Sequence, residues 1–338
     1  MTSEPPIRLA TDVDLDALAA MRAAEGWLVN RDLLDLLHHA RRARLFVIPH
    51  APTRSAFALD DAGGRSSLAS SVEDGPLAAV SAVAYGPIGF IGNVIVAPQG
   101  RGRGLGAHIM RHVIAWLAGE GVRRVELDAT PEGRRLYERL GFVPTERSWI
   151  VEGTPAALDR RHLADRAHGS THTLMDLRPG ALAVIAAVDR AALGGDRLDL
   201  LDALLAQPGV WARAAVGVDG NADGYLVARP MASPPDGLHV GPWVCRSPAV
   251  AAALLADVVS AKLNAAGAPL TPEAPLHAVV PGAARSALAF ARAIGLTPIP
   301  DDMRMRLAVP AHGGDSDASD PIAADTTLVY AMLAPMVG

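Results

Sequence analysis

Three kinds of residue are scarce in this chain, and each shortage limits what the protein can be. Cys245 is the only cysteine, so neither an intrachain disulfide nor a thiolate zinc cluster can form. Lys262 is the only lysine, so arginine carries almost every positive charge. Aromatic residues make up 4% of the sequence, which makes each tyrosine and tryptophan more informative than usual. These counts exclude a fold held together by disulfides or structural zinc.

Long apolar runs and an excess of positive charge are also missing. No run approaches the ~20 consecutive apolar residues that a membrane-spanning helix needs. The first residues, MTSEPPIRLATDVDLDALAAM, place acidic and polar positions where an export signal needs a basic start and an unbroken apolar stretch. With 31 basic and 36 acidic residues, the formal net charge is −5, whereas nucleic-acid binders usually carry a basic domain or stripe. We therefore expect a globular cytoplasmic protein with neither nucleic acid nor a membrane as a partner.

The chain is long enough for two domains. Its 338 residues are about twice the ~150 residues typical of one domain. The predicted order of strands and helices in the first half returns in the second half, although the residues differ. A polar, charged stretch over 154–173 is the predicted linker between a domain over 1–153 and a domain over 174–338.

Hairpins are part of the predicted architecture. Apolar runs at 77–84 and 90–96 flank the turn Tyr85-Gly86-Pro87, which is typical of antiparallel strands. Two stretches are predicted to be irregular: one rich in Ser, Gly and Asp over 51–75, and an acidic one over 312–325.

A glycine-rich loop joins the second of these strands to a helix. It reads RGRGLG over 101–106. Successive glycines let backbone N–H groups converge, and the start of the helix adds roughly half a positive charge. Arg101 and Arg103 add two further positive charges beside the glycines. The loop therefore predicts a binding site for a phosphate-containing ligand.

Two familiar phosphate motifs fit the loop less well than a third. A P-loop needs a lysine followed by Ser or Thr after its last glycine, and this loop has neither. A dinucleotide motif is matched by Gly102, Gly104 and Ala107, with Glu126 and Asp128 on the next strand as ribose ligands. However, four residues separate the strand from the loop, and a hairpin precedes it where a doubly wound fold would start. NAD binding stays open as an alternative.

The third motif carries a family resemblance. A strand ending in V-x-P, followed by Arg/Gln-x-x-Gly-x-Gly/Ala, is matched by VAP over 96–98 and RGRGLG over 101–106. A helix that carries a tyrosine and ends in Leu-Gly-Phe is matched by LYERLGF over 136–142. With both motifs at the expected separation, roughly residues 7–152 resemble the GNAT acyltransferase superfamily.

The resemblance implies an α/β (α+β) fold and a co-substrate. Each of two GNAT-like domains would hold a mixed, mostly antiparallel sheet with a central splay, flanked by helices. Pantetheine would enter the splay between two parallel strands, and backbone amides would hold the pyrophosphate of acetyl-CoA. The positions that match the family's acyl-CoA site are Val94, Ile95, Val96, Arg101, Gly102, Arg103, Gly104, Leu105, Gly106 and Ala107.

The resemblance also implies a reaction. An amine attacks the thioester directly, a base removes the amine proton, and an acid protonates the departing thiolate. Tyr137 occupies the position of the acid, and a phenol with a pKa of roughly 10 can supply this proton. The alternative role for Tyr137 is packing against Gly133 and Leu140 on the buried face of its helix.

The base is not evident from the sequence. Asn93 lies where relatives can carry a carboxylate, and an amide cannot take a proton. Glu25 and Trp27 follow the first helix and are candidates to line the acceptor pocket. Their alternative roles are those of a helix cap and a core residue. A chain of waters is a further candidate for deprotonation.

Two other features point away from additional chemistry. His108 and His112 share a helix face, but the glutamate of a zinc-protease helix is missing, so we expect no metal.

The second half looks like a degenerate GNAT domain, similar to that of bacterial two-domain members. Its loop reads GPWVCRSPA over 241–249, with no G-x-G and with a proline that lacks a donor. We expect this half to bind no acyl-CoA and to help wall the acceptor site.

The predicted function is N-acetylation of a small-molecule primary amine by acetyl-CoA, in a monomer or homodimer. One alternative is a protein or peptide N-acetyltransferase. The other is a non-catalytic, acyl-CoA-binding regulatory module in which Tyr137 is structural.

Overall fold

The computed structural model describes residues 4–27, 31–50, 75–231, 236–261, 270–310 and 324–332. The stretches 51–75 and 312–325, expected to be irregular, lie outside these ranges except for residues 75, 324 and 325. None of the helices in the described ranges is both long and apolar enough to cross a membrane.

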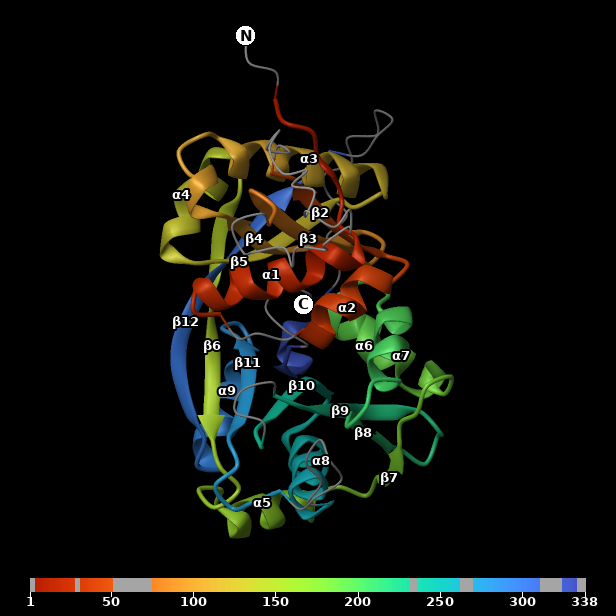
Figure 1. Cartoon of the computed structure of the whole chain (residues 1–338). Coiled ribbons are helices and arrows are strands. Elements are labelled where there is room, and N and C mark those ends of the chain that lie inside the picture. The colour runs from red at the N-terminus through yellow and green to blue at the C-terminus, as the bar shows by residue number, and fades with distance from the viewer. Residues whose placement is uncertain are drawn as a thin grey trace, which may run out of the picture.

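Local sequence signals account for much of the first half (Figure 1). The Thr130 hydroxyl accepts a hydrogen bond from the Gly133 amide at 3.3 Å, and Pro131 is the first residue of the helix that follows. Gly141, with φ of 92°, lies just after the end of that helix. The elements are β1 (Arg8–Leu9), α1 (Asp12–Ala24), α2 (Arg31–His39), β2 (Ala43–Ile48), β3 (Ala78–Ala84), β4 (Ile88–Val96), the 3-10 turn η2 (Pro98–Gly100), α3 (Leu105–Gly119), β5 (Arg124–Ala129), α4 (Pro131–Arg139) and β6 (Val143–Gly153).

The second half repeats this order of elements. The predicted linker contains a helix, α5, whose Leu163 is buried, so the segment is packed against the protein. From α5 onward, the elements are α5 (Arg160–Ala167), β7 (Thr173–Asp176), η3 (Leu182–Ile185), α6 (Ala186–Leu193), α7 (Leu198–Leu205), β8 (Trp211–Val216), β9 (Ala222–Pro230), β10 (Leu238–Cys245), α8 (Pro248–Ala261), β11 (Leu276–Pro281), α9 (Arg285–Ala293), β12 (Thr297–Ala308), η4 (Thr326–Leu328) and β13 (Val329–Ala331).

In the described residues, thirteen strands join into one sheet. Their order is β1-β2-β3-β4-β5-β12-β6-β11-β10-β9-β8-β7, and β13 pairs with β10. Only β4 with β5 and β10 with β11 are parallel pairs. The order is symmetric about its centre, because each strand of the first half has its counterpart at the mirrored place. The predicted fold class is confirmed, and two GNAT-like units form one continuous sheet.

The halves exchange their last strands at the centre of the sheet. In Figure 1, blue β12 and yellow-green β6 run beside each other. β12 of the second half pairs with β5 of the first, and β6 of the first pairs with β11 of the second. The Arg304 guanidinium on β12 lies 2.6 Å from an Asp128 carboxylate oxygen and 3.5 Å from one of Glu126. Glu126 and Asp128, the two acids considered as ribose ligands, therefore form ion pairs that hold β12 beside β5.

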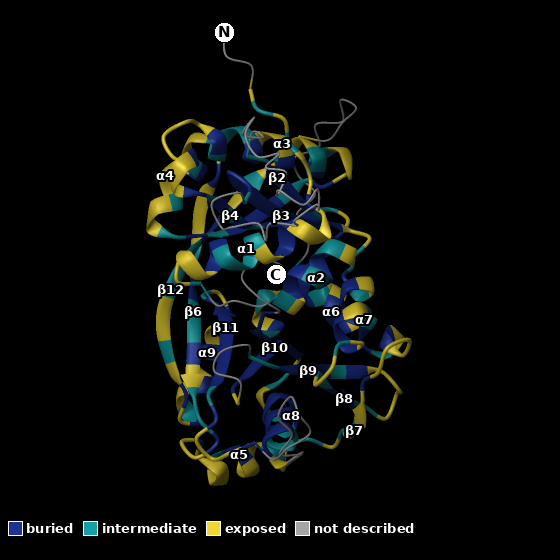
Figure 2. Cartoon of the chain, viewed as in Figure 1, coloured by how far each residue is buried: buried dark blue, intermediate teal, exposed yellow. Residues whose placement is uncertain are grey.

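Helices cover both faces of the sheet. Successive residues of a strand point to opposite faces, and β3 shows this directly. Ala79 and Val83 belong to the core under α1 and α2, whereas Val80 and Ala82 belong to the core under α3. In Figure 2, β3 has the dark blue of buried residues, whereas β6 and β12 at the centre of the sheet are mostly yellow and teal. A strand buried on both faces reads as a continuous apolar run, as β3 does.

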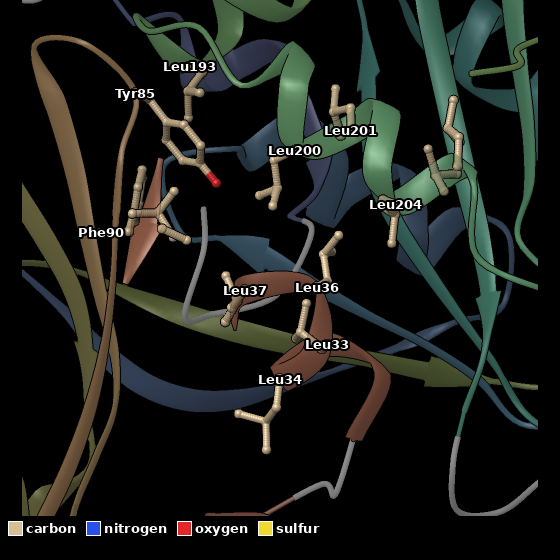
Figure 3. Close-up of a cluster of buried hydrophobic side chains, with 14 of the residues drawn as sticks. Leu33, Leu34, Leu36, Leu37, Tyr85, Phe90, Leu193, Leu200, Leu201 and Leu204 are labelled. Atoms are coloured by element: carbon tan, nitrogen blue, oxygen red, sulfur yellow. The ribbon is translucent and has the colours of Figure 1, made fainter. Parts of the chain in front are cut away.

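One hydrophobic core is shared by the two halves. Helix α2 from the first half packs against α7 from the second. Beside them, Leu193 of α6 lies next to Tyr85 of the β3–β4 hairpin (Figure 3). Burying such leucines contributes ~1.5–3 kcal/mol each, so the two halves stabilise each other. The side chains labelled there are Leu33, Leu34, Leu36, Leu37, Tyr85, Phe90, Leu193, Leu200, Leu201 and Leu204.

Candidate active site

The first feature of the site is a splay between β4 and β5. These strands pair in parallel only over Ile88–Phe90. Beyond that point β4 bends away, because Asn93 adopts φ of 53° in a bulge opposite β3. The splay expected from the family resemblance is therefore present, and the edge of β4 that faces it is not paired with β5 past Phe90.

Buried polar side chains fix this bulge. The Asn93 amide donates to the Ser81 hydroxyl at 2.8 Å, and its carbonyl oxygen accepts a hydrogen bond from Arg22. Burial lowers the pKa of Arg22 to about 10, which leaves it charged at neutral pH. The hydrogen bonds with Ser81 and Arg22 therefore hold Asn93 in the bulge. This structural role agrees with the conclusion from the sequence that Asn93 is not a base.

The glycine loop lies at the start of α3. Gly102 and Gly104 have φ of 73° and 75°, a left-handed conformation that favours glycine, and a Cβ at either would meet open space. The first N–H groups of a helix have no partner within it, so those of Leu105–Ala107 can bind an anion. Gly106 has a different role, because a Cβ there would lie 3.1 Å from Leu136 on α4. It allows α3 and α4 to pack closely.

Arg101 connects the loop to the first helix. Its guanidinium forms an ion pair with Glu25, and its Nε donates to the Val96 carbonyl at 3.1 Å. The Arg22 guanidinium lies 5.6 Å from the centre of the Trp27 ring. Glu25 and Trp27 both line the cavity described below.

Tyr137 lies on α4 with only 6% of its surface exposed. Its ring packs against Gly133, where a Cβ would lie 2.9 Å from Cε2, and edge-on against Phe142. Burial raises the pKa of Tyr137, and the charge of Asp302 raises it further. The phenol is therefore protonated at neutral pH and available as a donor. The packing role and the acid role of Tyr137 are compatible in this geometry.

A single cavity of about 940 Å³ connects these features. Its lining includes Glu25, Trp27, Val94–Val96, Arg101 and Tyr137 from the predicted set. Residues 102–107 are not part of the lining and lie on the loop beyond its Arg101 edge. This volume is at the upper end of the ~300–1,000 Å³ typical of ligand pockets.

The second half supplies residues that the sequence did not identify. Arg229, His239, His277, Asp301 and Asp302 all line the cavity. Of the strands that carry them, β11 and β12 pair with strands of the first half, and β9 and β10 follow next to β11 in the sheet. These pairings join segments far apart in the sequence, so local patterns gave no indication of where the residues lie. The one available signal is the Asp-Asp pair over 301–302, which interrupts an otherwise strand-like segment.

The titration behaviour of these residues follows from burial. Burial raises the pKa of Asp302 to about 7, with neighbouring Asp301 and Asp128 adding to the rise. Burial and the charge of Arg229 lower the pKa of His277 to about 4, so that imidazole is neutral at pH 7. His277 Nδ1 lies 3.1 Å from Nδ1 of His239.

The equivalent splay in the second half is filled by the chain itself. β10 and β11 pair in parallel at Leu238–His239 and then diverge. Between them lies β13, with Ala331 opposite Trp243 on β10 and the Met332 amide donating to the Val279 carbonyl at 2.7 Å. A Cβ on Gly241 would overlap the Met332 carbonyl oxygen, so glycine is needed for this close approach.

The two helix histidines have separate partners. His108 Nε2 lies 2.9 Å from the Pro5 carbonyl oxygen, and His112 packs edge-on against Phe46. These contacts account for both side chains without a shared ligand.

Comparison with known proteins agrees with this geometry. The family model "Acetyltransferase (GNAT) family" matches residues 20–142, and "Acetyltransferase (GNAT) domain" matches residues 185–311. No curated protein sequence gives a significant match.

Several solved structures share the fold. A putative acetyltransferase from Pyrococcus horikoshii has a TM-score of 0.69 at 18% identity, with 100% of this chain and 97% of that chain covered. A tandem GNAT protein from the clavulanic acid biosynthesis pathway has a TM-score of 0.57 at 13% identity, covering 91% and 100% of the two chains. A GCN5-related N-acetyltransferase from Sphaerobacter thermophilus has a TM-score of 0.53 at 18% identity, covering 90% and 96%. The chain therefore belongs to the GNAT acetyltransferase family, with two GNAT domains in tandem.

Proposed function

We propose that this protein is an N-acetyltransferase that moves an acetyl group from acetyl-CoA to the primary amine of a small molecule. The observation that carries the proposal is one continuous cavity that reaches both the splayed strand at Val94–Val96 and the phenol of Tyr137. A thioester lying along the strand and an amine entering from the other side would meet beside that phenol. Direct attack in a ternary complex then needs no covalent enzyme intermediate.

The loop and the strand divide the binding of acetyl-CoA between them. The amides of residues 102–107 would hold the pyrophosphate, with Arg101 and Arg103 adding charge. Backbone groups of Val94, Ile95 and Val96 would pair with the pantetheine arm along the free edge of β4. The left-handed glycines and the open space around them support this fit.

Tyr137 would act on the leaving group. When the amine nitrogen bonds to the carbonyl carbon, the C–S bond breaks and the thiolate takes the phenolic proton. Because burial keeps the phenol protonated, Tyr137 is in the form that this step requires.

The acceptor is better described as a small molecule than as a protein. Arg229, His239 and His277 of the second half help to line the cavity. A folded protein would need an open groove at this place to present a side chain. Glu25 and Trp27, which also line the cavity, are the candidate acceptor contacts from the first half.

Each chain would hold one acetyl-CoA. β13 lies in the second splay, where pantetheine would have to run, and the loop over 241–249 has no paired glycines. The second half would then contribute walls and residues to the first site instead of a site of its own.

An amine-panel assay with detection of released thiol tests the proposal. The panel should include alkylamines, polyamines, amino sugars and amino acids, each with an amine-free blank, and a short peptide with a free N-terminus. Thiol release above the blank with a small amine is the expected result. Release with the peptide alone would indicate a protein acceptor. Binding of acetyl-CoA without release for any amine would indicate a regulatory module.

A further inference from the structure

The exchanged strand β12 carries a bulge at the edge of the cavity. Its ladder with β6 shifts register between Pro300 and Met303, so Asp301 and Asp302 lie in the irregular stretch. Met303 then pairs with Ala129, the last residue of β5. Asp302 is therefore held beside the point where β5 ends and α4, the helix of Tyr137, begins.

Asp302 and Tyr137 line the same cavity from opposite halves of the chain. The two groups are close enough for the charge of Asp302 to raise the pKa of Tyr137. Across the part of the chain that the structure describes, no arginine, lysine or histidine forms an ion pair with Asp302 within 4 Å. A half-buried carboxylate without a cation partner is unfavourable unless a ligand supplies one.

Four other acids line the cavity. Asp128 and Glu25 have cation partners, Glu132 is exposed to solvent, and the Asp301 carboxylate accepts a hydrogen bond from the Asp302 amide. Asp128 accepts hydrogen bonds from Arg304 at 2.6 Å and from Ser148 at 2.7 Å. Glu25 is paired with Arg101. Asn93 is tied to Ser81 and cannot accept a proton from an amine.

We propose that Asp302, delivered by the second half, is the base that takes the proton of the acceptor's ammonium group in the first domain's site. The proposal rests on the proposed function and deepens it. It assigns to the degenerate second domain a catalytic residue, and it makes a cationic primary amine the class of acceptor.

The protons balance with two groups. The ammonium R–NH₃⁺ gives one proton to the Asp302 carboxylate, and the neutral amine nitrogen bonds to the thioester carbon. The C–S bond then breaks, and the thiolate takes the Tyr137 phenolic proton. The nitrogen, now bonded to the acyl carbon, returns its second proton to the Tyr137 oxygen. The products are the amide, the free thiol and one proton that leaves Asp302 for solvent.

The groups around Asp302 set the pH range of this step. Asp301 on β12, Asp128 on β5 and Glu132 on α4 all favour the protonated carboxyl, whereas Arg147 on β6 opposes them weakly. Tyr137 on α4 is neutral in this range. With a pKa of about 7, Asp302 is a carboxylate above neutrality and a neutral acid below it. Activity should therefore fall as the pH drops below about 7.

The test compares Asp302→Asn and Asp302→Glu with the wild type, using the best amine of the panel between pH 5.5 and 9.5. Asp165→Asn is the matched control, because Asp165 is exposed on α5 and is not part of the cavity lining. Calorimetry with acetyl-CoA on each variant reports whether the co-substrate site remains intact.

The expected result is a loss of at least ~100-fold in kcat for Asp302→Asn, with acetyl-CoA affinity unchanged and partial activity in Asp302→Glu. The wild type and Asp165→Asn should both lose kcat/KM below about pH 7, and Asp302→Asn should lack that acid limb. An Asp302→Asn variant that matches Asp165→Asn in kcat and keeps the limb overturns the assignment while leaving acetylation established. A wild type that acetylates no amine overturns both proposals.

Discussion

Met303 of the second half pairs with Ala129 of the first half. This register joins a strand from near the end of the chain to the strand that precedes the Tyr137 helix. It places acidic residues of one GNAT domain inside the cavity of the other. The tandem arrangement is thus part of how the site is built, since neither half alone contains all the residues that line it.

Replacing Tyr137 with phenylalanine tests its role as the acid. The phenylalanine ring keeps the packing on Gly133 and Phe142, so the fold and the Kd for acetyl-CoA should stay unchanged. The kcat should fall by ~100-fold, since general acid catalysis contributes at least that much. Tyr330→Phe is the control, because Tyr330 lies on β13 outside this cavity. Equal kcat in the two variants would make Tyr137 structural.

Replacing Gly104 with alanine tests the loop. The left-handed φ of 75° costs an alanine ~1–2 kcal/mol, and the new Cβ would occupy the open space beside the helix start. Gly86→Ala is a matched control, because Gly86 has φ of 78° and equally open surroundings at the β3–β4 turn. Both variants should lose similar stability in urea denaturation. Only Gly104→Ala should weaken acetyl-CoA binding in calorimetry, and equal affinities would argue against pyrophosphate at this loop.

Removing Arg304 tests the strand exchange. Arg304 is 5% exposed and pairs with two carboxylates of β5. Arg304→Ala leaves the buried Asp128 carboxylate without its cation partner, whereas Glu126 keeps Arg124 and Arg306. The free energy of unfolding should fall by ~3–5 kcal/mol. Arg306→Ala should cost less than ~1 kcal/mol, because the Arg306 side chain is 45% exposed where it pairs with Glu126. Similar urea midpoints for the two variants would contradict the proposed importance of the buried network.

The pKa of Asp302 predicts how stability depends on pH. Its pKa is about 7 in the folded protein, above the ~3.9 of an unfolded chain, so the folded state binds the proton more tightly between these values. The stabilising contribution of the protonated form is complete below about pH 4 and is lost as the pH rises through about 7. The Tm of Asp302→Asn should therefore exceed that of the wild type increasingly over this range. A Tm difference that stays constant with pH would contradict the raised pKa.

Much of the fold, including the glycine loop between β4 and α3, could be predicted from the sequence because its signals are local. Thr130 and Pro131 mark a helix start, Gly102 and Gly104 mark left-handed backbone, and the apolar runs mark strands. Each depends on a few neighbouring residues, and the structure places these elements where the sequence indicated.

The strand exchange and the acidic wall could not be predicted in this way. Either last strand, β6 or β12, could complete either half of the sheet as far as local patterns show. The apolar pattern predicts a strand over 303–309, whereas β12 starts six residues earlier, at Thr297, and includes the bulge at Asp301 and Asp302. Likewise, nothing local indicates that β13 fills the second splay.

A crystal structure with bound acetyl-CoA would show directly where the co-substrate lies. We expect one molecule per chain, with its pyrophosphate on the amides of residues 102–107, its pantetheine along Val94–Val96 and its thioester beside Tyr137. An empty loop at 102–107, or acetyl-CoA between β10 and β11 in place of β13, would contradict this expectation.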